Sequence, residues 1–318
     1  MSELEVVAAT AANLVASVGI ILVNKQLASV CEFNFLVTLL FLNFSTTGVV
    51  TMALAATGQF QEKHLPTRDR WMIAVVAVGT VLLNNASNEA NSVGFYQITK
   101  LLIVPTVLAI ERIGGKQSTL TSVLVLCLCV TACGVAVATV SDFEVNVRGS
   151  ILALFSILLT ARYQIWQNSK QHEYGVSGVQ ITHSVSMPQM VVGLIGTLIF
   201  DVFMPWVKRP LLLPGGGLLE YSGSSRDMFW ICVCCSLAVG MNLSTYWILG
   251  LTSPISYQVL GQVKTCLIVL LGYVFFDVRV APVWLGIRLT GVFVACIGAF
   301  SYATLKRRQA QSEKAKSQ

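Results

Sequence analysis

The sequence predicts an all-α membrane protein in which ten transmembrane helices form two inverted repeats of five helices each. Composition gives the first reason. Hydrophobic residues make up 55% of the 318 residues and charged residues only 11%, against about 25% charged residues in a typical soluble domain. So few charges cannot cover a surface that faces water on all sides, and the mean hydropathy is +0.72. A soluble globular domain, a disordered chain and a disulfide-stapled secreted module are therefore excluded.

The lengths of the apolar runs give the second reason. A hydrocarbon layer of about 30 Å is crossed by roughly 20 apolar residues in a helix. The first apolar run has no positively charged segment before it and no small-residue cleavage site after it. We therefore interpret it as a retained span and not as a signal peptide. In chain order the predicted spans are Val6–Val23, Phe33–Ala56, Trp71–Ser87, Phe95–Ile110, Ser118–Val140, Ser150–Gln167, Ile181–Trp206, Met228–Gly250, Ile255–Phe276 and Val280–Leu305.

The distribution of basic residues predicts the orientation of these spans. Ten spans place both termini on one side, where eleven of the 21 Lys and Arg residues fall, against six on the opposite side. Basic residues favour the cytoplasmic side, so we expect both termini there. The tail 306–318 is then a basic cytoplasmic segment. Its Lys314 and Lys316 either resemble a dilysine retrieval signal that vesicle coats recognise, or belong to an ordinary basic tail that touches anionic headgroups.

An internal sequence repeat gives the third reason. It divides the chain into a first repeat at 1–146 and a second at 147–305. In each half an Asn-x-Ser motif is followed by a Tyr-Gln pair and then by a lysine inside a span. Five spans per half is an odd number, so the halves are inverted relative to each other, as in many transporters with a site near the midplane. The two copies are Asn85, Tyr96, Gln97 and Lys100, and Asn242, Tyr257, Gln258 and Lys264.

The two lysines within spans are the clearest candidates for a binding site. A lysine in hydrocarbon costs at least about 2.5 kcal/mol, so it usually faces a cavity or a partner. Lys100 and Lys264 occupy corresponding spans, and the fourth span is also short and interrupted by Pro105. Either each lysine reaches an interface or pairs with a carboxylate, or both line one cationic cavity. We favour the cavity, because the acidic residues in or beside spans all lie near span ends.

Other polar side chains within spans are candidate ligands of the same cavity. Hydroxyl and amide groups that converge with ammonium groups away from bulk water bind anions well. A third Tyr-Gln pair, Tyr163 and Gln164, follows Arg162 in the sixth span, and Arg162 either reaches the cavity, pairs with Glu89 or extends to the membrane interface. The predicted substrate-binding residues are Lys100, Lys264, Thr265, Tyr96, Gln97, Tyr257, Gln258, Asn24, Lys25, Asn85, Tyr163, Gln164, Asn242, His183 and Ser186.

Catalytic and metal sites find no support in the sequence. No Ser/His/Asp set or carboxylate pair converges, so we expect no catalytic residues. The nine cysteines mostly fall in apolar runs without histidine or carboxylate neighbours, where cysteine behaves as a small apolar residue. We therefore expect no metal and no cofactor. The scattered basic residues also argue against a nucleic-acid partner.

The chain resembles the drug/metabolite transporter superfamily, in its triose-phosphate translocator and nucleotide-sugar transporter branch. Three stretches carry the resemblance: Tyr96-Gln97-Ile98-Thr99-Lys100 with Pro105, Tyr163-Gln164-Ile165-Trp166 with Lys170-Gln171-His172-Glu173, and the run Asn242–Asp277. The last run contains Ser253-Pro254-Ile255-Ser256-Tyr257-Gln258-Val259-Leu260-Gly261 followed by Lys264-Thr265. The resemblance extends from Asn24-Lys25 to Tyr302.

The resemblance implies a substrate class. Plastid phosphate translocators place Lys-Arg where this chain has Lys264-Thr265, and the Lys-Thr version is similar to a subgroup associated with uridine-diphosphate sugars. It implies antiport of a UDP-sugar against UMP by alternating access across a Golgi or endoplasmic reticulum membrane, with a homodimer as a further expected association. Family base recognition would fall on Gln180, His183 and Ser186. The alternatives are a phosphorylated-sugar translocator and a non-transporting scaffold or membrane-bound enzyme, and the sugar stays open.

Overall fold

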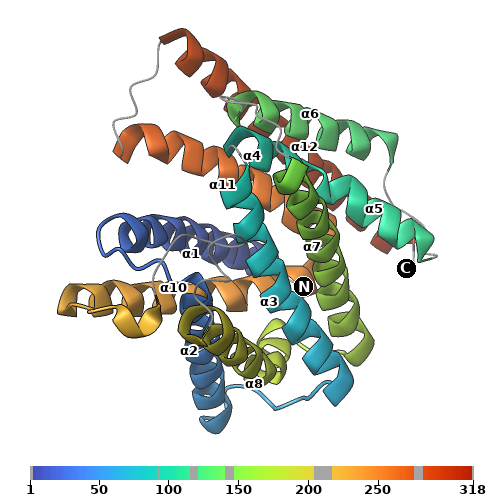
Figure 1. The fold of residues 1–318 in the computed structure, drawn as a ribbon. Coiled ribbons are helices and arrows are strands. Elements are labelled where there is room, and N and C mark those ends of the chain that lie inside the picture. Colours follow the sequence, from blue (N-terminus) through green and yellow to red (C-terminus); the bar gives the residue numbers. More distant parts are fainter. Residues whose placement is uncertain are drawn as a thin grey trace. The chain divides into compact units, whose positions relative to one another are not determined.

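The computed structural model describes residues 3–91, 93–114, 121–139, 147–203, 217–275 and 282–316. Every regular element within these ranges is a helix and no strand occurs among them (Figure 1). The predicted all-α class is therefore confirmed. In chain order the elements are α1 (Glu3–Ser29), α2 (Leu36–Ala56), α3 (Thr67–Ala90), α4 (Val93–Leu101), α5 (Ile103–Ile113), α6 (Ser122–Thr139), α7 (Val147–Tyr174), α8 (Gly178–Thr197), the π-helix η1 (Leu198–Phe203), the 3₁₀ turn η2 (Leu218–Glu220), α10 (Ser225–Leu251), α11 (Pro254–Phe275) and α12 (Pro282–Lys316).

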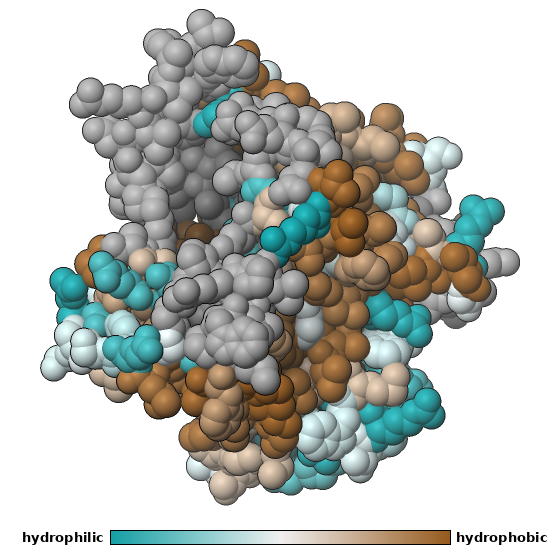
Figure 2. Space-filling view, in the orientation of Figure 1, coloured by the Kyte–Doolittle hydropathy of each residue, from teal (hydrophilic) through white to brown (hydrophobic). Residues whose placement is uncertain are grey.

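Eight helices of the described ranges are long and apolar enough to cross a membrane, which confirms a multi-pass membrane protein. They are α1, α2, α3, α6, α7, α8 with η1, α10 and α12, and they coincide with eight of the ten predicted spans. The predicted ninth span is α11. The predicted fourth span is divided into α4 and α5 at Leu102, three residues before Pro105. Figure 2 shows extensive apolar surface on the face in view, as lipid contact requires.

Two compact units make up the chain, and each contains segments from both halves of the sequence. Unit 1 comprises Met1–Ala90 and Ile151–Ser253, and unit 2 comprises Asn91–Ser150 and Pro254–Gln318. Unit 1 thus holds α1, α2, α3, most of α7, α8 and α10, whereas unit 2 holds α4, α5, α6, α11 and α12.

Unit 1 has two ends, each marked by bonds between connecting segments. At the first, the Lys63 ammonium donates to the Gly175 carbonyl (3.1 Å) and the Gln180 amide donates to the Gln61 carbonyl (2.8 Å). We call this the 57–66 end. At the other, the 30–35 end, the Tyr221 hydroxyl lies 3.0 Å from the Cys31 carbonyl oxygen. Since α2 joins residue 35 to residue 57, the two ends lie about one span apart.

The long helices of unit 1 begin and end at these two ends. A capping box at Ser177 and Gln180 starts α8 at the 57–66 end, and a second one at Ser224 and Asp227 starts α10 at the 30–35 end. Such boxes satisfy backbone N–H groups that have no partner inside the helix. Helix α10 therefore runs antiparallel to α1, which ends at Ser29 beside residues 30–35.

A buried carboxylate stabilises the start of α2 in the same way. Asp201 of η1 is fully buried, and its Oδ2 accepts hydrogen bonds from the Thr38 backbone N–H (2.8 Å) and hydroxyl (2.7 Å). A negative charge at a helix N-terminus is favourable because it meets the positive end of the helix dipole. The sequence predicted only that Asp201 lies near a span end.

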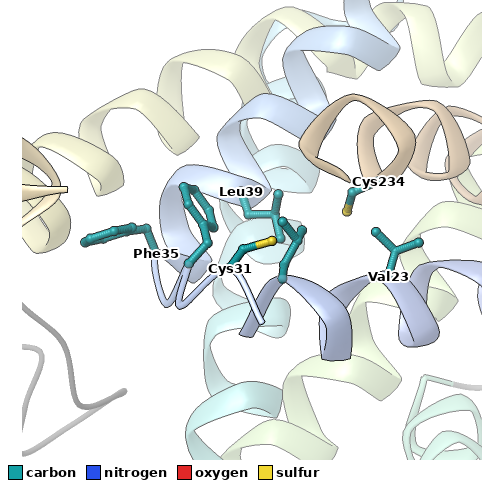
Figure 3. Close-up of a cluster of buried hydrophobic side chains, with 7 residues drawn as sticks. Val23, Cys31, Phe35, Leu39 and Cys234 are labelled. Atoms are coloured by element: carbon teal, nitrogen blue, oxygen red, sulfur yellow. The ribbon is translucent and has the colours of Figure 1, made fainter. Parts of the chain in front are cut away.

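An apolar cluster holds the 30–35 end together. Val23, Cys31, Phe35, Leu39 and Cys234 contribute buried side chains from α1, α2, α10 and the α1–α2 connection (Figure 3). The Tyr221 ring lies edge-on to Phe33 and Phe35, with centroids 5.4 and 5.5 Å away. Burial, together with the hydrogen bond to the Asp227 carboxylate, raises the pKa of the Tyr221 hydroxyl to about 12. Burial also raises the pKa of the Cys31 thiol.

Small residues set the packing in unit 2, where α6 and α12 cross closely. A Cβ atom on Gly291 would lie 2.5 Å from the Ala138 backbone nitrogen and 2.7 Å from the Gly134 carbonyl oxygen. A Cβ atom on Gly298 would lie 2.6 Å from the Thr131 backbone nitrogen. Glycine is required at such positions because it lets two helix backbones approach in a membrane.

Candidate functional site

Lys100 lies at the break between α4 and α5 in unit 2. It occupies the last turn of α4, and its Nζ lies 4.2 Å from the centroid of the buried Tyr96 ring. The Leu102 N–H donates to the Thr99 carbonyl (3.1 Å), so the helix tightens before α5 begins. A cation near a helix C-terminus is stabilised by the helix dipole. Among the described residues no carboxylate lies within salt-bridge distance of Lys100.

Lys264 shows the same arrangement on α11, also in unit 2. Its side chain is buried, with 9% of the residue exposed, and its Nζ lies 5.3 Å from the centroid of the Tyr257 ring. Next to it, the Thr265 hydroxyl donates to the Gly261 carbonyl (3.2 Å). The Thr265 hydroxyl hydrogen is used in this bond. It has to break the bond to the Gly261 carbonyl before it can donate to an anion.

A tyrosine ring attracts a lysine ammonium group without neutralising it as a carboxylate would. The ring quadrupole stabilises the ammonium group by about 0.5–2 kcal/mol. Tyr96 is one turn before Lys100, and Tyr257 is two turns before Lys264. Both pairs therefore place an ammonium group over a tyrosine ring of the same helix; anion binding by these lysines stays a prediction. The side chain of Gln97 lies outside the described ones, and Gln258 is half-buried on α11.

The predicted asparagines belong to unit 1, where each has an intramolecular partner. The Asn242 amide donates to the Thr47 hydroxyl (2.9 Å), and the Asn85 amide donates to the Val81 carbonyl of its own helix (2.8 Å). Asn24 Oδ1 accepts from the Cys234 thiol at 3.2 Å. The Asn242 and Asn24 bonds join α10 to α2 and α1. The side chain of Lys25 lies outside the described ones.

Tyr163 belongs to a buried polar cluster that sequence reasoning found only in part. Its hydroxyl lies 3.1 Å from the Tyr246 hydroxyl, which also accepts from the Gln189 amide at 3.2 Å. Gln164 and Gln167 on α7 are buried at 6% and 0% exposure. The missed members, Tyr246, Gln189 and Gln167, are polar residues inside predicted spans. Their position inside spans could have identified them, because a polar side chain buried in a span needs a hydrogen-bond partner.

His183 and Ser186 lie on α8 of unit 1, the first near the 57–66 end. The His183 ring lies between Phe60 and His64, with centroids 5.7 and 5.8 Å away, and its Nε2 is 3.9 Å from a Glu62 carboxylate oxygen. Ser186 is fully buried, and its hydroxyl donates to the His183 carbonyl (2.8 Å). The structure therefore gives both residues partners within unit 1.

Comparisons with a family model, with curated proteins and with solved structures show which known proteins this chain resembles. The model of the Triose-phosphate Transporter family matches residues 6–303. UDP-xylose transporter 2 of Arabidopsis thaliana is 32% identical over 316 residues, which cover 98% of this chain and 85% of that protein. UDP-rhamnose/UDP-galactose transporter 1 of the same plant is 34% identical over 312 residues, which cover 96% and 86%. A solved crystal structure shares the fold with a TM-score of 0.64 at 14% identity, covering 94% of this chain and 98% of that one.

Proposed function

The chain belongs to the triose-phosphate transporter family, and on this premise we propose that it exchanges a UDP-sugar for UMP across a Golgi or endoplasmic reticulum membrane. The family consists of transporters, so the chain is not an enzyme. Relatives that cover nearly the whole chain at 31–34% identity are UDP-sugar transporters, which supports a nucleotide sugar as the substrate.

The observation that carries the proposal is the pair of lysines held over tyrosine rings in unit 2. Lys264 is buried, and Lys100 lies at a helix break, so both ammonium groups are partly withdrawn from solvent. A diphosphate needs such charges, since charge-assisted hydrogen bonds are roughly twice as strong as neutral ones. Thr265 adds a hydroxyl beside Lys264, which suits a diphosphate better than a second cation would.

The directions and contacts of the helices support two inverted repeats, at 1–146 and 147–305. The equivalent pairs would be α1 and α7, α2 and α8, α3 and α10, α4–α5 and α11, and α6 and α12. Gly193 on α8 packs against Phe41 on α2, and Gly48 on α2 packs against Ser186 on α8, so these equivalent helices run antiparallel. The α3–α8 contact has its counterpart in the α10–α2 contact, and the α4–α6 contact in the α11–α12 contact.

The division into units fits alternating access. Unit 1 takes the first three spans of each half, and unit 2 takes the last two. Unit 1 therefore contains three of the equivalent pairs and unit 2 the other two, so that no pair is divided between the units, which suits movement of one body against another. We propose both termini on the cytoplasmic side. Recognition of Lys314 and Lys316 by vesicle coats and assembly into a homodimer stay predictions.

Exchange in proteoliposomes tests the proposal. Vesicles preloaded with UMP or GMP are given a panel of labelled nucleotide sugars, and we expect UMP to stimulate the uptake of UDP-sugars far more than GMP does. Lys264→Ala should lower exchange about tenfold to more than a hundredfold, because one charged hydrogen bond contributes about 1.5–3 kcal/mol. Lys100→Ala should weaken exchange strongly, whereas the control Lys63→Ala should transport normally.

Each outcome contradicts a different part of the proposal. Near-normal uptake by Lys264→Ala would remove the site assignment, and a preference for GMP would remove the uridine assignment. Uptake of a phosphorylated sugar but of no nucleotide sugar would favour the phosphate-translocator alternative.

A further inference from the structure

Unit 1 contains a cavity, and none of the residues that line it belongs to the predicted substrate-binding set. It has a volume of about 260 Å³ and is lined by Arg68, Asp69, Met72 and Ile73 of α3 and by Trp166 and Lys170 of α7. Helix α3 begins at Thr67 and α7 ends at Tyr174, so the cavity lies at the 57–66 end of unit 1.

Two basic side chains line the cavity: Lys170, which ion pairs hold in place, and Arg68, which is exposed. The Lys170 ammonium is 3.1 Å from Asp69 and 2.8 Å from Glu173, and it lies 5.3 Å from the Tyr174 ring centroid. The Tyr174 hydroxyl also donates to Asp69 (2.8 Å). The Lys170 ammonium is therefore shared between the Asp69 and Glu173 carboxylates. Arg68 is exposed, and among the described residues no carboxylate lies within salt-bridge distance of it.

The remaining wall is apolar. Ile73 is buried to 1% exposure, Met72 is half-buried, and the Trp166 ring carries the Arg162 guanidinium at 4.8 Å. Tryptophan and basic side chains together are typical of the level of the lipid headgroups. The site thus combines a guanidinium with a surface for carbon atoms.

Size selects among the anions that could enter. Pockets that enclose a whole drug-sized ligand measure about 300–1,000 Å³, so a cavity of about 260 Å³ is too small for a nucleotide sugar. It can hold one phosphate group and the first carbon atoms attached to it. Arginine is suited to this task, because its planar fork binds two phosphate oxygens at once.

We infer that the α3–α7 cavity is a second anion site, which binds the phosphate group of an anionic phosphate ester through Arg68 and Lys170. Met72, Ile73 and Trp166 contact the carbon side of the ester. Basic cavities between membrane helices bind anionic lipid headgroups, and a soluble phosphate shares the same chemistry. This inference does not depend on the transported substrate.

Thermal melting of the purified full-length protein in detergent tests the site. The probes are dioctanoyl phosphatidylinositol 4-phosphate, dioctanoyl phosphatidylcholine and inorganic phosphate, each titrated against wild type, Arg68→Gln and Arg68→Lys. We expect the anionic phospholipid to raise the melting midpoint of wild type. Arg68→Gln should need at least about tenfold more of it, since a charge-assisted bond is lost. Arg68→Lys should fall between the two, because lysine keeps the charge but not the fork.

Lys63→Gln is the matched control, because Lys63 is a basic residue at the same end of unit 1 that does not line the cavity. It should respond as wild type does. An Arg68-dependent shift with inorganic phosphate alone would identify a free phosphate as the ligand. Equal shifts in wild type and Arg68→Gln, or equal shifts with phosphatidylcholine and the anionic phospholipid, would overturn the site.

The same measurements separate this site from the proposed substrate site. Lys264→Ala should keep the phospholipid response, whereas stabilisation by UMP should depend on Lys264 and not on Arg68. Failure of the UMP response alone would contradict the proposed function and leave the α3–α7 site standing.

Discussion

Pro188 creates a missing hydrogen bond inside α8, and Arg70 supplies the replacement. Proline has no backbone N–H, so the Ser184 carbonyl four residues earlier loses its usual helical donor. The Arg70 Nε–H donates to that carbonyl at 2.7 Å. The Ser184 hydroxyl in turn accepts from the Leu65 backbone N–H at 3.1 Å. The start of α3 is thereby fixed to the stretch of α8 that contains His183 and Ser186.

We predict that Arg70→Gln destabilises the protein by about 1.5–3 kcal/mol, the contribution of a hydrogen bond from a charged group. The loss should depend on Pro188. In a Pro188→Ala background the new N–H of residue 188 can donate to Ser184, so the same Arg70→Gln change should cost less than about 1 kcal/mol. The two substitutions should therefore couple by roughly 1–2 kcal/mol, which is well above the usual deviation from additivity.

A double-mutant cycle measures this coupling. The free energy of unfolding is obtained from denaturant titrations followed by helical circular dichroism, for wild type, both single variants and the double variant. Arg68→Gln is the control, because Arg68 lies only two residues before Arg70 on α3, on a different side of the helix, and has no hydrogen bond to α8 among the described residues. Strict additivity of the Arg70 and Pro188 changes would refute the reasoning, as would an equal loss in the Arg68 control.

Three further predictions concern packing, capping and reactivity. Gly291→Ala should lower the melting midpoint by several degrees because the new methyl group meets the α6 backbone at 2.5 Å, whereas Gly286→Ala, with nothing within 4 Å, should leave it unchanged or raise it. Asp201→Ala should cost about 2–4 kcal/mol in unfolding free energy, since it leaves two buried donors of Thr38 unpaired, and Asp201→Asn should recover part of that loss. Cys31, which is buried and has a raised thiol pKa, should resist maleimide at pH 7.5 in the native protein and react after denaturation in SDS. An equal drop in melting midpoint for Gly286→Ala and Gly291→Ala would contradict the packing prediction. Equal losses of unfolding free energy for both Asp201 variants would contradict the capping prediction, and rapid labelling of Cys31 in the native protein would contradict the reactivity prediction.

The all-helical, multi-pass character of the fold could be predicted from composition, because apolar runs of span length have no other stable state in a bilayer. Pro105 also indicated the break in the fourth span, although the break falls at Leu102. The partnership of Asp201 with Thr38 could not be predicted. It joins residues 163 positions apart, and only the packing of η1 beside α2 brings them together.

The candidate site could be predicted where local spacing decides the contact. Lysines one or two turns after a tyrosine on the same helix can reach its ring, and both Lys100 and Lys264 do so. Spacing along one helix says nothing about partners on other helices. Sequence reasoning therefore missed Tyr246 as the partner of Tyr163, and it did not foresee that the compact units would interleave the two halves of the chain.

Helix α7 shows why a polar stretch within a span carries functional information. Its first half is apolar, but from Arg162 to Tyr174 nearly every residue is polar or aromatic. This stretch is roughly 18 Å long at 1.5 Å per residue, and it leads from the last turns of the predicted span, which ends at Gln167, to the 57–66 end of unit 1. One face of it, with Trp166 and Lys170, lines the α3–α7 cavity, and another, with Tyr163, meets α8 and α10.

Where this stretch lies within the span, up to Gln167, its polar groups are expensive to leave in lipid, because each unpaired polar group costs several kcal/mol there. Hydrogen bonds, ion pairs and cation–aromatic contacts inside unit 1 meet part of the cost along the stretch, while the buried Gln171 amide has no hydrogen-bond partner among the described residues. A purely structural span would need none of these groups, since apolar residues pack equally well. We therefore expect polar-to-apolar changes such as Tyr163→Phe to alter exchange kinetics more than stability. Unchanged exchange together with a lowered melting midpoint would show that this stretch of α7 serves the fold alone.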